Sequence, residues 1–259
     1  MSGRAWLILP TYDEAANLAA VVSDARAVLA RAAPEGFRIL VVDDASPDGT
    51  GDVADALAAV HPEVEVLHRP GKDGLGSAYQ AGFRWAMDAD AAHVLLMDAD
   101  GSHAATDLAV LLGRARNGAD LVIGSRYVPG GGVRDWGRGR RLVSRAGCGY
   151  ARSVLGADLR DLTAGLLCFS AVALEEIGHA GLRSRGYAFH VELKWRALRR
   201  GLRVEEVPIV FAARRSGRSK MTPRIALEAA WMVPVLRLTA SGGSRRIERP
   251  PRASLTGHS

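Results

Sequence analysis

Short apolar runs alternate along the first half of the chain with longer segments in which apolar residues recur every three or four positions. The short runs are typical of buried strands, and the longer segments are typical of amphipathic helices. Strand and helix repeated at this spacing predict an α/β fold, with a mostly parallel central sheet covered by helices on both faces. The expected strands are 5–9, 38–42, 64–67, 93–97 and 121–124, and the expected helices are 14–31, 50–59, 75–87 and 105–117.

This alternation breaks after Ser125. Glycine and arginine are frequent in residues 128–139, which favours an exposed loop over regular structure. Loops of this length are usually functional or disordered. Beyond the loop we expect helices over 141–155 and 189–200 and strands over 166–169 and 204–210.

The apolar stretch 225–238 is a poor candidate for a membrane-spanning helix. It is interrupted by Glu228, Pro234 and Arg237, whereas a spanning helix needs about 20 predominantly apolar residues. We expect an amphipathic helix that packs on the domain or lies in the membrane interface, and packing is the favoured interpretation. The predicted organisation is a main domain over 1–221, this helix within 222–240 and a disordered tail over 241–259.

The composition agrees with one large domain. The chain has 259 residues, of which 48% are hydrophobic and 24% are charged, so it can bury one sizeable core. Cys148 and Cys168 lack the spacing of a disulfide framework or a metal site, and we expect both in the core. The N-terminus has no secretory signal pattern, which predicts a cytoplasmic protein.

The net charge is +6, and the basic residues are concentrated in two stretches. Such clusters attract phosphate groups, nucleic acid or an anionic membrane surface, although a solvated basic face is the alternative for any single arginine. Nucleic-acid binding is disfavoured, because interleaved aromatic residues and a recognisable module are lacking. The two stretches contain Arg134, Arg138, Arg140, Arg141, Arg145 and Arg152, and then Arg214, Arg215, Arg218, Lys220 and Arg224.

Carboxylates collect directly after three of the expected strands, in segments 10–14, 43–50 and 98–103. In a doubly wound sheet, ligands bind where loops leave the carboxyl ends of the strands. Carboxylates brought together there repel one another unless a cation or a hydrogen-bonding ligand balances them. The pattern therefore predicts a metal and nucleotide site at this edge.

Asp98 and Asp100 are the most specific part of this pattern. They follow the apolar run 94–97, and residues two apart in extended backbone point to the same side. One carboxylate can then reach a metal while the other reaches a sugar or ribose. An isolated Asp-x-Asp triplet also occurs in turns and helix caps, but its position at a strand end favours the functional interpretation.

The remaining polar residues of these loops have simpler interpretations. Asp48 or Thr50 is expected to cap the following helix, while Asp43 or Asp44 is placed to hydrogen-bond a base or ribose. The glycines of 71–76 lack the ending of a P-loop, so we expect a turn there, with Lys72 as a candidate phosphate contact.

In their order and spacing, these motifs resemble those of the polyprenol-phosphate (dolichol-phosphate) mannose synthases of glycosyltransferase family 2. The resemblance runs from about Leu7 to Met221 and implies the GT-A fold, which is a Rossmann-like α/β architecture. It also implies transfer of mannose from GDP-mannose to a polyprenyl phosphate, with inversion and with Mg2+ or Mn2+ as cofactor. The matching segments are 9–14, 42–50, 74–76, 97–103, 124–127, 161–163 and 211–221.

On the donor side, the resemblance implies roles for individual residues. Asp98, Asp100, Arg214 and Lys220 match catalytic positions, and the two basic residues match contacts to the diphosphate. The nucleotide-sugar positions are Pro10, Tyr12, Glu14, Val42, Asp44, Asp98, Ala99, Asp100, Arg214 and Lys220.

The resemblance also implies a metal site and an acceptor site. Asp100 and Ser102 match the metal positions. Arg126, together with Arg140 and Ser144 one helical turn apart, matches positions that hold the lipid phosphate. Because a phosphate nucleophile is already an anion at neutral pH, the implied reaction needs no strong general base.

The chain departs from the family pattern after 161–163. Relatives usually continue with glycine, an aromatic residue and arginine, whereas Gly165 is followed here by Leu166, Leu167 and Cys168. If the missing arginine holds the acceptor or supports the acidic site, acceptor preference or activity will differ. Two alternatives stay open: a sibling transferase that uses UDP-glucose, and a nucleotide-binding homologue with impaired catalysis.

The expected partners are GDP-mannose and a membrane polyprenyl phosphate, without nucleic acid. The expected location is the cytoplasmic face of the membrane, reached without a spanning helix. Contact with the membrane would come from the acceptor itself, the helix at 225–238, the basic surface or a membrane-protein partner.

Overall fold

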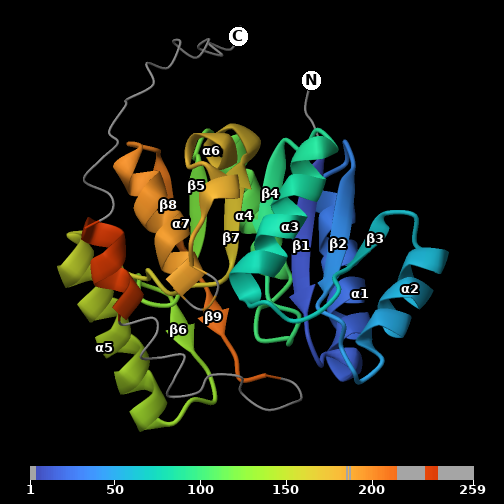
Figure 1. Ribbon diagram of the computed structural model, residues 1–259, viewed down its shortest axis with the longest axis horizontal. Helices are drawn as coiled ribbons and strands as arrows, with labels where there is room; N and C mark the ends of the chain where they lie inside the picture. The colour runs from blue at the N-terminus through green and yellow to red at the C-terminus, as the bar shows by residue number, and fades with distance from the viewer. Residues whose placement is uncertain (1–3, 185, 187, 215–230, 239–259) are drawn as a thin grey trace, which may run out of the picture.

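The computed structural model describes residues 4–184, 186, 188–214 and 231–238. At its centre is a seven-stranded sheet (Figure 1). In sheet order the strands are β3 (Val64–His68), β2 (Phe37–Asp43), β1 (Ala5–Thr11), β4 (His93–Leu96), β7 (Leu167–Ser170), β5 (Leu121–Ser125) and β8 (Val204–Pro208). Only β7 runs antiparallel to its neighbours in this sheet, so the prediction of a mostly parallel sheet is confirmed.

The sheet separates two hydrophobic cores. In β1, Trp6 and Ile8 enter one core while Leu7 and Leu9 enter the other, as the alternation of side chains along a strand requires. Burial on both faces explains why the strands are continuous apolar runs in the sequence. The Leu7 core is closed by α1 (Ala15–Ala32), α2 (Thr50–Val60) and α4 (Thr106–Arg116), and the Trp6 core by α3 (Leu75–Asp88), α5 (Arg138–Leu155), α6 (Ala171–Glu176) and α7 (Ala188–Arg199).

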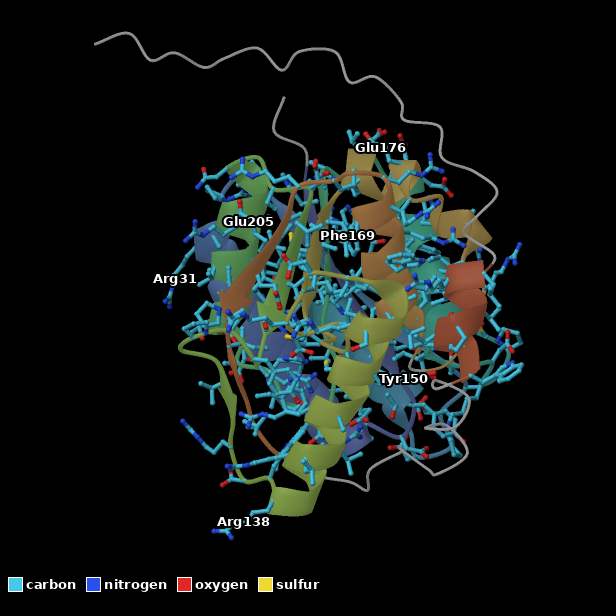
Figure 2. All side chains as sticks on the ribbon, turned by 90° about the vertical axis from the view of Figure 1, so that its left-hand side faces the viewer. Arg31, Arg138, Tyr150, Phe169, Glu176 and Glu205 are labelled. Carbon is cyan, nitrogen blue, oxygen red and sulfur yellow. The ribbon has the colours of Figure 1, made fainter. Side chains whose placement is uncertain are left out.

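The parallel strands present their carboxyl ends at one edge of the sheet, which is the lower edge in Figure 1. At this edge the short strands β6 (Gly132–Val133) and β9 (Val210–Phe211) pair in parallel. Figure 2 shows α5 rising from Arg138, at the same lower edge, along the side of the domain. The candidate site is built from these elements and the loops between them.

Three features differ from the sequence-based expectation. The predicted loop 128–139 contains β6, and α5 begins within it at Arg138. The predicted strand 204–210 is divided into β8 and β9 near Pro208, a residue without an amide hydrogen to donate to a ladder. α6 was not predicted, because its 6 residues are too few to show helical periodicity.

The described part of the expected C-terminal helix, residues 231–238, packs on the domain. Val233 and Leu236 are buried in the same core as α5, and the Arg237 guanidinium donates to the carbonyl of Val154. Trp231 points outward and is 75% exposed. The rest of the expected helix and the expected tail lie outside the described residues. Among the helices that the structure describes, none has the length and apolarity needed to cross a bilayer.

Candidate active site at the carboxyl edge of the sheet

Hydrogen bonds between loops bring the acidic segments together. The amide of Asp44 donates to the carbonyl of Thr11 (3.1 Å), which joins the ends of β2 and β1. The Asp48 carboxylate accepts a hydrogen bond from the amide of Ala15 (3.1 Å). β4, which leads into Asp98, lies directly beside β1. The structure thus places the three acidic strand ends side by side, as the sequence predicts.

Asp48 and Thr50 lie where the second acidic loop leads into α2, and they also connect this loop to the first. The cap of α2 is Gly49, whose φ of 85° suits glycine, and it makes no side-chain cap hydrogen bond. Asp48 accepts a hydrogen bond from the amide of Thr50 (3.1 Å), and the Thr50 hydroxyl accepts one from the amide of Glu14 (2.9 Å). Asp48 thus satisfies the first amide of α2, as predicted for a capping residue, although the N-cap position itself is Gly49. Both side chains also stabilise the junction between the first two acidic loops.

Asp100 is the carboxylate around which several residues predicted to bind the nucleotide sugar meet. It is 4% exposed, and its Oδ1 accepts hydrogen bonds from the hydroxyl and the amide of Ser102, the latter at 3.0 Å. Its Oδ2 lies 3.0 Å from Nε of Arg214, and Nη1 of Arg214 lies 3.5 Å from Glu14. Lys220 lies outside the described residues.

This arrangement fits the protein side of a divalent-cation site that is completed by a substrate. Within the described residues, no group of three or more His, Cys, Asp and Glu side chains is arranged to hold an ion. Mg2+ in transferase sites, however, is commonly bound through one or two carboxylates plus substrate phosphates. Asp100 and the hydroxyl of Ser102 supply oxygen ligands of the kind that Mg2+ and Mn2+ prefer.

Asp44, a predicted nucleotide contact, is held by an arginine that sequence reasoning missed. Arg69 forms an ion pair with it, and the amide of Asp73 also donates to it. Burial raises the pKa of Asp44, and the Arg69 guanidinium opposes that shift. Arg69 follows β3 directly, so the rule that selected the acidic loops would also have selected this residue. Nearby, Nζ of Lys72 lies 3.7 Å from the ring centroid of Tyr12.

The other predicted nucleotide positions differ in what they present. Pro10 is partly exposed at the end of β1. The side chain of Val42 is fully buried in the Trp6 core, and Ala99 is 2% exposed. Val42 and Ala99 therefore have mainly backbone atoms to offer to a ligand.

Asp98 lies at the open side of the acidic loop, with its side chain 33% exposed. Its Oδ2 is 4.0 Å from Nε2 of His103. Burial lowers the pKa of His103 to about 4, so its imidazole is neutral at pH 7. A Cβ at Gly165 would lie 3.4 Å from Oδ2 of Asp98, which shows how closely the segment after Asp161 approaches this carboxylate.

On the acceptor side, Arg126 is held by a buried ion pair. Its Nε donates to Oδ2 of Asp161 and its Nη2 donates to Oδ1, each at 2.7 Å. Nη2 also donates to the Thr163 hydroxyl (2.7 Å). Burial would raise the pKa of Asp161, but the hydrogen bonds and charge of Arg126 outweigh it and lower that pKa to about 2. The guanidinium is thus fixed in place, and Arg126 lines a surface cavity of about 190 Å³.

Arg140 and Ser144 both lie on α5, as predicted. The Tyr127 hydroxyl donates to Oγ of Ser144 (2.7 Å), and the Arg140 guanidinium lies over the ring of Trp136, 4.0 Å from its centroid. Tyr127 adjoins Arg126 in the sequence, so the three predicted acceptor positions are held around the start of α5. Trp136 and Tyr127 were not predicted, because aromatic residues in a loop carry no distinctive spacing.

β9 joins the two halves of the site. The amide of Ala212 donates to the carbonyl of Ser102 (3.0 Å). The Phe211 ring packs edge-on against His103, with 4.9 Å between centroids, and Cζ of Arg126 lies 5.7 Å from the Phe211 centroid. One aromatic ring therefore lies between the acidic loop and the arginine of the acceptor side.

Lys194 is a fully buried cation below the acceptor side. Its ammonium donates to the carbonyls of Leu162 (3.0 Å), Ala164 (2.7 Å) and His190 (3.3 Å), and so ties α7 to the segment that carries Asp161. Burial lowers the pKa of Lys194 to about 7, and the charge of Asp161 opposes this shift only in part. Sequence reasoning missed it, although helical periodicity places position 194 on the inward face of α7.

The depressed pKa of Lys194 predicts a specific pH dependence of stability. The unfolded chain keeps this proton up to about pH 10.4, whereas the folded chain loses it near pH 7. Unfolding therefore takes up a proton between these values, and stability rises with pH there by at most about 1.4 kcal/mol per pH unit. We expect the free energy of unfolding of the wild type, relative to Lys194→Met, to increase from pH 7 to pH 9.

Urea denaturation of both proteins at pH 7, 8 and 9 measures this difference. Lys72→Met is the matched control, because Lys72 is exposed, and its difference from wild type should stay constant. A constant difference for Lys194→Met as well would show that Lys194 keeps its proton throughout this range.

The doubly wound sheet, with these carboxylates and Arg214 at its carboxyl edge, has the architecture of a GT-A glycosyltransferase. The chain belongs to glycosyl transferase family 2, whose family model matches residues 6–178. The resemblance to polyprenol-phosphate mannose synthases is confirmed by two relatives. The polyprenol monophosphomannose synthase of Mycolicibacterium smegmatis is 46% identical over 89% of this chain and 85% of its own length. The undecaprenyl-phosphate mannosyltransferase of Micrococcus luteus is 48% identical over 87% of this chain and 90% of its own length.

Solved structures confirm the fold at lower sequence identity. Glucosyl-3-phosphoglycerate synthase from Mycobacterium tuberculosis superposes with a TM-score of 0.65 and 20% identity, over 93% of this chain and 80% of that chain. The same enzyme has been crystallised with Mn2+ and UDP-glucose and with Mg2+ and UDP, each with a TM-score of 0.63. At this identity the likeness establishes the GT-A architecture.

Proposed function

We propose that this enzyme transfers mannose from GDP-mannose to the phosphate of a membrane polyprenol, with inversion at the anomeric carbon. The two relatives above support the lipid-phosphate acceptor and the sugar. The observation that carries the proposal is that β9 and the residues after it contact both halves of the site. Arg214, three residues after β9, lies beside Asp100, and Phe211 of β9 lies beside Arg126. These contacts support a donor carboxylate site next to a guanidinium that could hold an anionic acceptor.

In this proposal the residues of the chain bind and orient two anions. Arg126, Arg140 and Ser144 hold the acceptor phosphate, whose oxygen attacks the anomeric carbon, so no side chain has to remove a proton. Arg214 stabilises the negative charge that gathers on the departing diphosphate, as fixed charges do in transfer reactions. A divalent cation bound at Asp100 and Ser102 would add Lewis-acid stabilisation of the same charge.

Exposed apolar side chains support a peripheral contact with the membrane. On α5, Leu142 and Val143 are 70% and 71% exposed, and Trp231 in segment 231–238 is 75% exposed. Leu142 and Val143 adjoin the predicted acceptor positions Arg140 and Ser144 on α5, where an acceptor embedded in a bilayer has to approach. Such side chains bury favourably in the interfacial region of a bilayer.

The test is a transfer assay with purified protein, Mg2+ and a polyprenyl phosphate supplied in vesicles, with GDP-mannose, UDP-glucose and UDP-N-acetylglucosamine offered separately. We expect a mannolipid with the β-anomeric configuration from GDP-mannose, and co-sedimentation of the protein with the vesicles. Turnover with UDP-glucose alone would contradict the proposed sugar, and an α-linked product would contradict inversion.

A further inference from the structure

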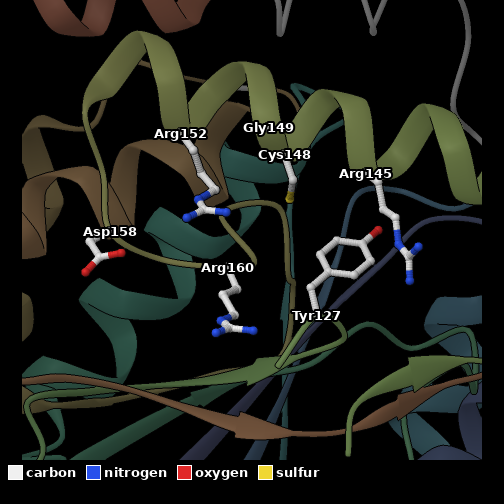
Figure 3. A pocket seen from close by; sticks show the side chains of 7 residues that line it. All are labelled: Tyr127, Arg145, Cys148, Gly149, Arg152, Asp158 and Arg160. Carbon is white, nitrogen blue, oxygen red and sulfur yellow. The ribbon is translucent and has the colours of Figure 1, made fainter. Parts of the chain in front are cut away.

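A second cavity, of about 460 Å³, opens along the flank of α5. Its size is within the range of about 300–1,000 Å³ that is usual for small-molecule sites. Figure 3 shows α5 above the cavity, with Arg145, Cys148 and Arg152 pointing down from it, and Tyr127 and Arg160 below. The cavity is lined by Tyr127, Arg145, Cys148, Gly149, Arg152, Asp158 and Arg160, so it includes none of the predicted donor or acceptor residues.

The lining has an excess of positive charge. Arg145, Arg152 and Arg160 contribute three guanidinium groups against the one carboxylate of Asp158. In the part of the chain that the structure describes, these three arginines form no ion pair within 4.0 Å, and the buried Nε of Arg152 has no hydrogen-bond partner. An anion that enters the cavity would balance the unpaired positive charge of the three guanidinium groups.

The charge of the lining favours a phosphate over a carboxylate. Arg145 and Arg152 reach down from α5, and the Arg160 side chain lies below Arg152 (Figure 3). A carboxylate carries a single negative charge, whereas a phosphate monoester carries about −1.5 to −2 at pH 7 and has three acceptor oxygens, which suits three guanidinium groups. Asp158 is at the same rim as an acceptor for hydroxyl groups.

The α5 side of the cavity is connected to the acceptor side. Sγ of Cys148 lies 3.2 Å from the Thr163 hydroxyl and 3.4 Å from the Asp161 carboxylate, both of which hold Arg126. Gly149 leaves the wall open, because a Cβ built on it meets no atom within 4 Å. The site is therefore adjacent to the proposed acceptor position but has its own set of donors.

We propose that this cavity is a second anion site, which binds the phosphate monoester of a hydroxyl-bearing molecule such as a polyol phosphate. The ligand is either a soluble phosphate ester or the equivalent headgroup of a lipid. The proposal does not depend on the sugar or the acceptor of the transfer reaction, because binding is measured without turnover.

Isothermal titration calorimetry with glycerol 3-phosphate tests the site, with glycerate as the carboxylate counterpart. We expect saturable binding of the phosphate and weaker binding of glycerate. Arg152→Gln and Arg160→Gln should each weaken binding roughly tenfold, since each removes a charge-assisted hydrogen bond. Arg31→Gln is the matched control, because Arg31 is an exposed arginine on α1, on the other face of the sheet.

Gly149→Leu provides a second variant that keeps every charge and fills the cavity, and it should abolish binding. Vesicles containing phosphatidic acid, compared with phosphatidylglycerol vesicles, distinguish a lipid source from a soluble one: preference for the monoester lipid that Arg160→Gln removes assigns a headgroup. Absence of saturable binding to glycerol 3-phosphate and of a phosphatidic acid preference would overturn the proposal. An equal loss in Arg31→Gln and Arg160→Gln would overturn it as well.

Discussion

Replacing Asp100 with alanine or asparagine is expected to lower kcat by a factor on the order of 10²–10³ or more, which is the usual cost of removing one preorganised electrostatic group. Asp100 is the carboxylate that Ser102 and Arg214 share. Without its charge, the proposed cation loses the carboxylate assigned to it, and Arg214 loses the closer of its two anionic partners. Steady-state transfer assays with saturating donor and acceptor measure the effect.

The asparagine variant separates charge from shape, because it keeps the size of the side chain. Asp88→Asn is the control: Asp88 is exposed at the end of α3, away from the carboxyl edge of the sheet. It should keep full activity, and circular dichroism should show all three variants folded. If Asp100→Asn retained more than about a tenth of the wild-type kcat, the metal and leaving-group role of Asp100 would be wrong.

The strands and long helices could be predicted because their buried residues leave apolar patterns in the sequence. Strands such as β2 and β4 are buried on both faces, so their apolar runs are visible in the sequence without knowledge of their partners. Parallel strands end at the same edge of a sheet, so the loops that follow them share that edge, and this is why Asp44 and Asp100 could be assigned to one site. β6 and α6 were missed because their 2 and 6 residues are too short for periodicity.

The part of the site that was missed consists of buried partners. Lys194 is charged, and charged residues are almost never fully buried unless paired; its hydrogen bonds to the carbonyls of Leu162 and Ala164 join positions distant in sequence. Asp161 lies in a segment that matches the family, but its ion pair with Arg126 likewise depends on a contact distant in sequence. Leu167, which stands where relatives have arginine, is also a buried residue. Leu167 is fully buried in the Trp6 core, between Leu96 of β4 and Ile123 of β5. The buried cation next to this segment is contributed by α7, through Lys194.

Asp161→Ala is expected to lower the free energy of unfolding by about 3–5 kcal/mol, because it leaves the buried Arg126 charge without its partner. The Arg126 side chain is 8% exposed and that of Asp161 is fully buried. Urea denaturation at pH 7 measures the loss. Asp158→Ala is the control, since Asp158 is exposed in the same segment, and its effect should stay within about 0.5 kcal/mol.

A double-mutant cycle decides whether the loss comes from the unpaired charge. Arg126→Met together with Asp161→Ala should cost less than the sum of the two single changes, by about 0.5–3 kcal/mol, because no charge is then left unpaired. The pH dependence gives an independent check. The folded pKa of Asp161 is lowered to about 2, below its unfolded value near 3.9. Its contribution is therefore complete above about pH 4 and is lost as the pH falls through 2. Additive single and double effects would mean that the pair is not coupled, and Arg126 would then not be fixed in place by Asp161.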